Sequence, residues 1–412
     1  MKFGVITREE FDKYFNGSKY SHFMQTSSWG EVSKVRNQTP VYVGLKDGKK
    51  IVAAALLLKR SMPLGYCYFY ACKGFCLDYS NEKIFHEFTV GIKQFLKDNK
   101  AVNLIVDPEI MYQEIDANAQ AVDGGKNNYP IYNMFVKEGY KHQGFTRLYE
   151  LRQPRFTFRI DTTVSMEEIE SKMNKTFLKT VKRSYNYDLE VLDSYDTDTF
   201  YKLLKDIAAK DNFTGNPIKF YDELDKNMVK SNNMHYVTIK IYPSKLLKKA
   251  KDELKDVKEK IENSPAKHLA DLQNQQTRLE KDIEMFEKYK DHKDGLISLI
   301  LICPKTKNQM WTLYIGNNDL AEYTFAVPRA YYEAIKYAHD NDFEFLDLFG
   351  TMGDPNFKIR NSASIHEFKR KMGGEYIELI GEFILVNKPI LYFIIPRVTK
   401  LLHKIKKVIK RK

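Results

Sequence analysis

The sequence lacks an apolar stretch long enough to cross a membrane as a helix. A spanning helix needs about 20 predominantly apolar residues in succession, and every apolar run in this chain is shorter. The first residues, MKFGVITREEF, also lack a basic region followed by an apolar run, the pattern of a secretory signal peptide. We therefore expect a cytoplasmic protein without a membrane span.

Cysteine is scarce, with four residues in a chain of 412. Cys67, Cys72 and Cys76 fall in one aromatic stretch, and Cys303 stands alone. No CxxC pair and no histidine at a suitable spacing accompanies them, as a zinc site would require. We expect buried thiols in a reducing cytosol and no metal site.

Net positive charge is small except at the C-terminal end, because Lys and Arg are largely offset by Asp and Glu elsewhere. The net charge is +12, but residues 388–412 contain nine Lys or Arg and no Asp or Glu, which leaves +3 for the rest. On a helix, Val398, Leu401, Leu402, Ile405 and Ile409 would share one face and the lysines the other. A basic amphipathic helix of this kind favours an anionic membrane surface. A solvated terminal helix and a nucleic-acid contact are the alternatives.

Apolar and aromatic residues, 43% and 13% of the chain, suffice for packed cores of mixed α/β type. Residues 41–46 and 51–60 predict two strands joined by a turn at Asp47-Gly48, followed by a helix over 82–99 and a buried strand over 103–108. A second unit begins near 157–162. Its predicted strands are 190–194, 235–242, 295–304 and 309–316, and its helix 329–342 leads into a strand over 343–350. The repeated order indicates two similar α/β domains.

Residues 245–290 interrupt the second unit with a different pattern. Apolar residues recur at alternating spacings of three and four on both sides of Pro265, the a/d seam of a coiled coil. The two seams consist of Leu247, Ala250, Leu254, Val257 and Ile261, and of Leu269, Leu272, Gln276, Leu279, Ile283 and Phe286. We expect an antiparallel helical hairpin. It either contacts a nucleic acid or serves as a stabilising or dimerising projection.

Six stretches, in order along nearly the whole chain, resemble blocks of the Fem family of non-ribosomal peptidyl transferases. They are SHFMQTSSWGEVSK (21–34), YFYACKGFCLDY (68–79, with Cys76 at a position where the family has another residue), NLIVDPEIMYQ (103–113), MNKTFLKTVKRSYNYDLEV (173–191), and residues 313–355 and 366–392.

This resemblance implies an α/β (α+β) fold of two tandem GNAT-like (acyl-CoA N-acyltransferase-like) domains with an inserted antiparallel coiled-coil hairpin. The expected parts are a first domain over 1–153, a second over 154–244 and 291–385, the arm over 245–290, and a basic amphipathic tail over 386–412. The family's Lys/Arg-rich helix would correspond to residues 175–183.

The resemblance also implies an aminoacyltransferase without a cofactor. Such an enzyme moves Gly, Ser or Ala from aminoacyl-tRNA to the stem peptide or nascent bridge of a lipid II type precursor. It would contact the inner face of the plasma membrane through its basic tail, and a homologous Fem-type protein is a candidate partner.

The implied reaction is attack of an amine on an activated ester, which needs positioning and oxyanion stabilisation more than a covalent nucleophile. Asp107 follows a buried strand and precedes Pro108, so it could orient or deprotonate the amine; a turn or helix cap is the structural alternative. Lys369 is the candidate for stabilising the oxyanion or the tRNA end. Alternatively, it is a surface lysine in a basic run.

Further candidates follow from the resemblance. Those for the precursor's phosphates and muropeptide are Lys34, Arg36, Lys179, Arg183 and Tyr221, with Lys34 on the first expected helix. Those for the tRNA end or peptide are Tyr70, Tyr314 and Gly316. Tyrosines in so Tyr-rich a chain commonly pack in cores, and Gly316 and Gly350 indicate close backbone approach at strand ends.

Two other functions fit the pattern less well. A GNAT-fold N-acyltransferase with another donor, such as an acyl-CoA, would need a Q/R-x-x-G-x-G/A run, which the sequence lacks. A non-catalytic protein that binds tRNA or membrane through the arm and tail would not need Asp107 and Lys369 at element ends.

Overall fold

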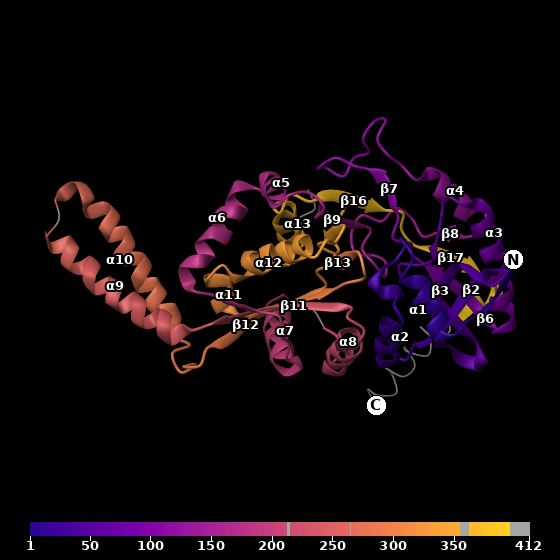
Figure 1. Cartoon of the computed structure of the whole chain (residues 1–412), viewed down its shortest axis with the longest axis horizontal. Helices are drawn as coiled ribbons and strands as arrows, with labels where there is room; N and C mark the ends of the chain where they lie inside the picture. The colour runs from indigo at the N-terminus through magenta and orange to yellow at the C-terminus, as the bar shows by residue number, and fades with distance from the viewer. Residues whose placement is uncertain (212–214, 264, 355–361, 396–412) are drawn as a thin grey trace, which may run out of the picture.

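The computed structural model describes residues 1–211, 215–263, 265–354 and 362–395. It is a mixed α/β protein with three sheets and a helical arm that projects from one end (Figure 1). The mixed α/β class and the inserted hairpin expected from the sequence are confirmed.

The first sheet has the strand order β1-β2-β3-β4-β6-β17-β8, with β5 paired to β3. Its strands are β1 Lys2–Val5, β2 Thr39–Asp47, β3 Lys50–Ser61, β4 Cys67–Ala71, β5 Cys76–Leu77, β6 Ala101–Val106, β8 Lys141–His142 and β17 Phe383–Val386. The expected turn between β2 and β3 is present, and Gly48 supplies its left-handed residue at φ 58°. The associated helices are α1 Arg8–Phe15, α2 Ser27–Ser33, α3 Glu82–Asp98 and α4 Tyr129–Lys137, with short 3-10 turns at η1 Phe23–Gln25, η2 Lys34–Arg36 and η3 Pro63–Gly65.

The remaining strands form two smaller sheets. The five-stranded sheet runs β13 Gln309–Trp311, β15 Phe345–Asp347, β9 Phe156–Asp161, β16 Glu375–Leu379 and β7 Met111–Glu114. The four-stranded sheet runs β10 Glu190–Leu192, β11 Met234–Ile241, β12 Leu296–Pro304 and β14 Tyr314–Asn317. Their helices are α5 Met166–Lys172, α6 Lys175–Ser184, α7 Thr197–Asp211, α8 Ile218–Lys230, α11 Asp319–Tyr323, α12 Ala326–Asp340 and α13 Ser362–Arg370, with a 3-10 turn at η4 Tyr185–Tyr187.

The single strand predicted over 309–316 is wrong, because the chain changes sheets within it. β13 pairs with β15, whereas β14 pairs with β12 in the other sheet. Between them the amide of Thr312 donates to Asp347 O at 2.9 Å and that of Leu313 to Ile302 O at 2.9 Å. The two sheets separate at this point and leave room between β14 and the chain after β15.

Two strands also cross between the halves of the chain. β7 pairs with β16 in the five-stranded sheet, and β17 pairs with β6 and β8 in the first sheet. A boundary drawn at 153/154 therefore does not separate the sheets, and the division into domains stays a prediction.

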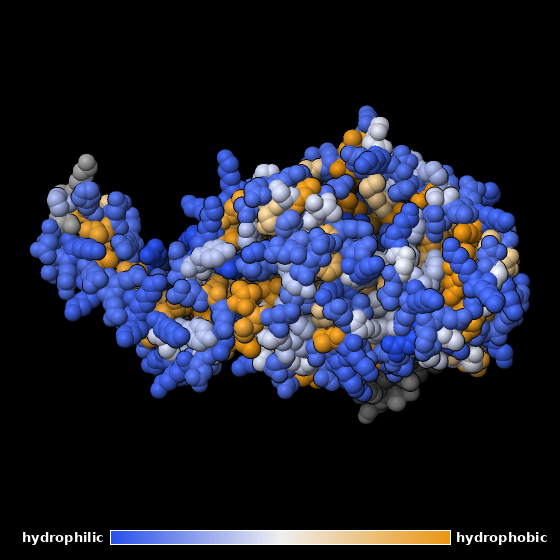
Figure 2. All heavy atoms as spheres, viewed as in Figure 1, coloured by the Kyte–Doolittle hydropathy of each residue, from blue (hydrophilic) through white to orange (hydrophobic). Residues whose placement is uncertain are grey.

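The arm consists of α9 Pro243–Asn263 and α10 Ala266–Glu287, inserted between β11 and β12. Seam residues Leu247, Ala250, Val257, Leu279 and Phe286 are buried, as the alternating spacing predicts. Figure 2 shows apolar residues gathered along the arm among polar ones.

Within the described residues, no helix is long and apolar enough to span a membrane. All four cysteines are buried, as expected. The basic amphipathic helix predicted after Pro396 lies outside the described residues. Of the preceding segment, residues 389–395 are helical.

Candidate active site

The carboxylate of Asp107 lies directly after β6 and is buried, with 5% of the residue exposed. Its Oδ2 accepts a hydrogen bond from the Tyr70 hydroxyl at 2.7 Å, and its Oδ1 accepts one from the backbone N–H of Lys73 at 2.8 Å. Burial raises the pKa of Asp107 to about 6. The carboxylate is therefore ionised at neutral pH and is more basic than an exposed aspartate.

A chain of buried charges joins Asp107 to the five-stranded sheet. Lys73 Nζ pairs with Glu109 at 2.8 Å, and Glu109 also pairs with Arg159. Arg159 Nε in turn donates to Asp347 at 2.8 Å. Although burial opposes it, the pull of Lys73 and Arg159 holds the pKa of Glu109 below its usual value. Removing any one member would leave a buried charge uncompensated, so this chain fixes the two sheets relative to each other.

Lys369, on α13, is buried beside the end of β15. Its ammonium donates to the carbonyls of Phe349 at 2.9 Å and Gly350 at 2.7 Å, and 8% of the residue is exposed. Burial lowers the pKa of Lys369 to about 8. Since an ammonium carries three N–H donors, one remains for a ligand as far as the described residues show.

Two non-glycine residues at this site hold left-handed backbone conformations, Lys73 at φ 54° and Phe349 at φ 57°. Such conformations cost free energy for residues with a Cβ atom and cluster at functional sites. Here they aim the Lys73 N–H at Asp107 and the Phe349 carbonyl at Lys369. The amide of Phe349 also donates to Asp347 at 2.7 Å, so the chain of buried charges continues from Asp107 to the surroundings of Lys369.

Lys369 lines a cavity of about 470 Å³ that opens where the two smaller sheets separate. Its walls are mainly apolar and aromatic, with polar residues Thr312, Asn317 and Glu322 among Tyr149, Ile207, Leu313, Tyr314, Ile315, Val327, Tyr331, Leu348, Phe349, Ile365 and Phe368. Gly350 also lines it and packs so closely on Pro154 that an added Cβ would lie 2.2 Å from Pro154 Cγ. The close approach predicted at Gly350 is confirmed. A largely apolar cavity lined by the buried ammonium of Lys369 suits a ligand with a developing negative charge at that point of the wall.

Arg36 lies at the rim of this cavity. Its guanidinium donates to Asn216 Oδ1 at 2.6 Å and stacks on the Phe220 ring at 4.2 Å. Asn216 Nδ2 donates in turn to the hydroxyl of Tyr314, a cavity residue, at 3.3 Å. Tyr221 is 1% exposed and packs under Tyr314 with ring centroids 5.5 Å apart. Tyr221 therefore supports the rim from below, whereas Arg36 is exposed there.

The other predicted cations lie elsewhere. Lys34 caps the C-terminal end of α2, the second helix of the chain and not the first, and pairs with Glu31 at 2.6 Å. Lys179 is exposed on α6, and Arg183 stacks on Phe325 and lines a separate cavity of about 360 Å³ at the base of the arm. Figure 1 shows α6 far from α2. The structure therefore does not bring these cations into one anchor.

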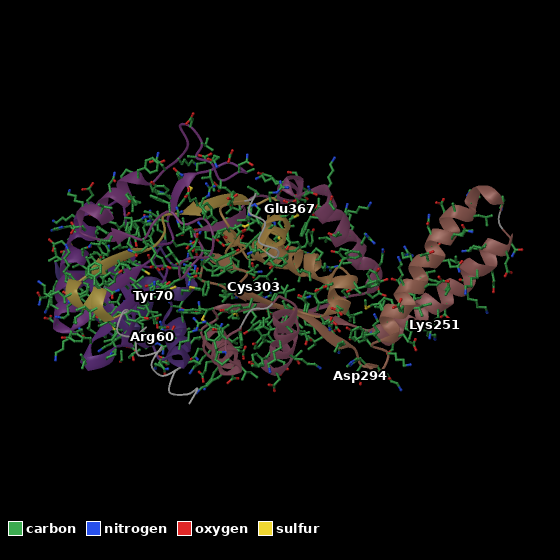
Figure 3. All side chains as sticks on the ribbon, turned by 180° about the vertical axis from the view of Figure 1, so that it is seen from behind. Arg60, Tyr70, Lys251, Asp294, Cys303 and Glu367 are labelled. Atoms are coloured by element: carbon green, nitrogen blue, oxygen red, sulfur yellow. The ribbon has the colours of Figure 1, made fainter. Side chains whose placement is uncertain are left out.

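Gly316 is buried against α7, where an added Cβ would lie 3.1 Å from Leu203 Cβ. The predicted close approach is confirmed, but the neighbour is a helix. Contact of Gly316 with a tRNA end is accordingly not supported. Tyr70, in contrast, lies in the site through its bond to Asp107 (labelled in Figure 3).

Sequence reasoning missed the charged residues around Asp107, which include Lys73, Glu109, Arg152 and Glu382. Glu382 is 3% exposed and accepts two hydrogen bonds from Arg152 Nη1, at 2.9 and 3.1 Å. Its charge adds to the rise in the pKa of Asp107, and burial raises the pKa of Glu382 itself. The sequence did contain a signal for Glu382, since it is the one acid within the apolar run 379–386. An acid that is buried with such a run needs a charged partner or a function.

The comparisons with known proteins agree over the whole chain. Residues 6–400 match the FemAB family. The lipid II:glycine glycyltransferases of Staphylococcus aureus strains MRSA252 and USA300 are each 25% identical over 435 aligned residues, which cover 99% of this chain and 99% of theirs. A crystal structure of FemX, 21% identical, superposes with a TM-score of 0.75 over 96% of this chain and 100% of that one, and so shows the same fold.

Proposed function

Since this chain belongs to the FemAB family, we propose that it is an aminoacyltransferase acting on a lipid-linked peptidoglycan precursor. Its relatives of nearly equal length are named for glycyl transfer to lipid II. The observation that carries the proposal is the buried ammonium of Lys369, which lines a largely apolar cavity. Backbone hydrogen bonds at Lys73 and Phe349, and the ion pairs between Lys73, Glu109, Arg159 and Asp347, link it to the buried carboxylate of Asp107.

This arrangement fits attack of an amine on an ester. Asp107 accepts a proton from the attacking amine, for which a carboxylate of raised pKa is suited. As the tetrahedral intermediate collapses to the amide, the ester C–O bond breaks and that proton passes to the departing alcohol oxygen. The remaining N–H of Lys369 stabilises the negative charge that develops on the ester carbonyl oxygen. The apolar walls exclude water, which would otherwise hydrolyse the ester.

We infer that the donor is an aminoacyl-tRNA carrying Gly, Ser or Ala. The tRNA ester is already activated, so the site needs neither a covalent nucleophile nor a cofactor. The cavity beside Phe368-Lys369 is the proposed place for the aminoacylated 3′ end, with Tyr314 and Tyr149 as stacking surfaces.

The proposed acceptor site lies on the side of Arg36 and Lys34. Both follow α2 within the turn η2 and would meet the precursor's phosphates. Lys179 and Arg183, at the base of the arm, suit the body of the tRNA better because they lie on the exposed face of α6. We propose two GNAT-like domains, 1–153 and 154–244 with 291–385, and a peripheral membrane contact through the tail.

Replacing Arg36 with leucine should raise KM for the precursor roughly tenfold or more, because a charge-assisted hydrogen bond contributes about 1.5–3 kcal/mol. The value of kcat should change little, since Arg36 lies at the rim. Steady-state kinetics with varied precursor measures both constants. Lys34→Leu, the neighbouring phosphate candidate, should have a smaller effect because Lys34 pairs with Glu31; a larger effect would make Lys34 the main phosphate anchor.

The pH dependence of kcat should be bell-shaped. Asp107 must be deprotonated, so activity is lost as the pH falls through its raised pKa of about 6. Lys369 must be protonated, so activity is lost as the pH rises through its lowered pKa of about 8. If kcat did not change between pH 5 and pH 9, a range that includes both pKa values, these roles would be contradicted.

The identity of the acyl donor can be tested by supplying the same amino acid either as a tRNA ester or as a CoA thioester. The full chain is incubated with a water-soluble precursor and either glycyl-tRNA, seryl-tRNA or alanyl-tRNA, or the corresponding CoA thioester. Transfer from one of the tRNA esters alone is expected. Transfer from the thioester instead would favour the GNAT-type acyltransferase.

A further inference from the structure

Three segments meet at the end of the first sheet opposite Asp107. Ser61 at the end of β3 pairs with Cys67 at the start of β4, and Cys67 pairs with Ala101 at the start of β6. The chain after β17 returns to this end, since the amide of Lys388 donates to Val102 O at 3.0 Å. We call residues 59–66, 97–100 and 388–394 the sheet-end surface.

Apolar side chains on this surface are unusually exposed. Leu64 is 91% exposed, Ile390 73%, Phe393 56% and Ile394 45%. Single exposed apolar residues are ordinary, but these four come from two segments that touch: Lys388 Nζ lies 5.9 Å from the ring centroid of Tyr66. Tyr392 packs against the core and so holds the helix of residues 389–395 in place.

Leucine at position 64 does not stabilise the fold, either through its backbone conformation or through burial of its side chain. Its backbone is left-handed, at φ 60°, a conformation that favours Gly, Asn or Asp over leucine. Its side chain gains nothing from burial, because it is almost fully exposed. A residue that is unfavourable on both counts points to a contact outside the chain.

The net positive charge of the sheet-end surface favours an anionic partner. The sheet-end surface contains five cations and one acid: Lys59, Arg60, Lys97, Lys100 and Lys388, with Asp98. The chain leaves this surface into residues 396–412, which carry eight further Lys or Arg and no Asp or Glu. Apolar side chains surrounded by cations complement a bilayer with anionic headgroups, which takes up the former and attracts the latter.

We propose that the sheet-end surface docks onto an anionic lipid bilayer, with Leu64 and the helix of residues 389–395 inserted. The inference rests on the proposed function for its purpose, since it brings the enzyme to a lipid-linked acceptor. Thr39 at the start of β2 pairs with Lys59 of this surface, whereas Arg36, three residues earlier, contacts Asn216 and Phe220. Asp107 lies beyond the other end of β6, about 20 Å away for six residues of strand.

Figure 3 shows the relation of the two ends: Arg60 belongs to the sheet-end surface, and Tyr70, the partner of Asp107, lies above it in that view. The basic tail alone would account for binding to anionic lipid. A contribution from Leu64, more than 300 residues earlier in the sequence, is specific to the proposed surface.

Co-sedimentation of the full chain with vesicles tests the surface. The wild type should bind phosphatidylcholine vesicles that contain phosphatidylglycerol and bind pure phosphatidylcholine weakly. Leu64→Asn should bind the anionic vesicles roughly tenfold more weakly, because most of one leucine side chain is no longer inserted. Asparagine suits φ 60° better than leucine does, so the variant should fold at least as well.

Val136→Asn on α4, which replaces another exposed apolar residue (47% exposed), is the matched control and should bind like the wild type. Equal binding of Leu64→Asn and wild type would overturn the proposal, as would equal binding to both vesicle types. A lower solution mass of Leu64→Asn than of wild type would also overturn it, since the surface would then join two copies.

Transfer assays separate this inference from the proposed function. With a water-soluble precursor, Leu64→Asn should match the wild type; with the precursor embedded in anionic vesicles, it should be roughly tenfold slower. If the wild type modified neither precursor, the proposed function would fail, while the vesicle-binding result would still decide the surface.

Discussion

Replacing Lys369 with methionine should lower kcat by about 100- to 1,000-fold, the usual effect of removing one oxyanion donor. Methionine keeps most of the volume and apolar contact of the lysine stem, so the cavity should keep its shape. It cannot donate to the carbonyls of Phe349 and Gly350 or to a developing oxyanion. Single-turnover measurement of amino-acid transfer would report the loss directly.

Lys371→Met is the control for this variant, because Lys371 lies two residues further on, is more exposed and pairs with Glu367. It should retain activity. Affinity of Lys369→Met for the precursor, measured by calorimetry, should equal that of the wild type. Lost precursor affinity with unchanged single-turnover rate would instead make Lys369 a substrate anchor.

Replacing Asp107 with asparagine should lower kcat by about 100- to 10,000-fold, the range expected for a general base. The amide has nearly the same shape and can still accept one hydrogen bond, from either Tyr70 or the Lys73 backbone. It cannot take a proton from the attacking amine. Steady-state kinetics should show a lower kcat with little change in KM for the precursor.

The pH profile of Asp107→Asn separates a base from a structural residue. Its residual activity should no longer fall as the pH decreases through 6, because the group with that pKa has been removed. The loss above pH 8, assigned to Lys369, should persist. If the loss of activity at low pH survives in the variant, another carboxyl group is the base, and Glu382, whose charge acts on Asp107, is the next candidate.

The parts of the fold that depend on local pattern could be predicted from the sequence. The alternating three- and four-residue spacing on both sides of Pro265 predicted the arm, because the residues of a coiled-coil seam follow one another in consecutive helical turns and are visible in the local sequence. The Asp47-Gly48 turn predicted the β2–β3 hairpin for a similar reason.

Choices between partners far apart in the sequence could not be predicted. Residues 309–316 (QMWTLYIG) read as one strand, but the strand divides because β15 and β12 offer competing edges in different sheets. The pairing of β7 with β16 and of β17 with β6 likewise joins segments far apart in the sequence, so no local pattern predicts it.

In the candidate site, too, features with a local sequence pattern could be predicted, and features that depend on distant residues could not. A buried strand ending in Asp-Pro indicated where Asp107 lies. Lys34 and Arg36, in contrast, had similar sequence signals, yet Arg36 faces Asn216 and Phe220 and Lys34 faces Glu31. That difference arises because α2 ends at Ser33 and the chain tightens into a 3-10 turn. The burial of Lys369 depends on carbonyls twenty residues earlier, which no local pattern reveals.

Transfer of a labelled amino acid from charged tRNA to the lipid-linked precursor tests the central claim most directly. The full chain is incubated with radiolabelled glycyl-, seryl- or alanyl-tRNA and with lipid II in vesicles. At least one donor should place its label on the precursor, and prior treatment of that tRNA with ribonuclease should abolish the product. No labelled precursor with any of the three, under conditions in which a staphylococcal glycyltransferase is active, would contradict the account.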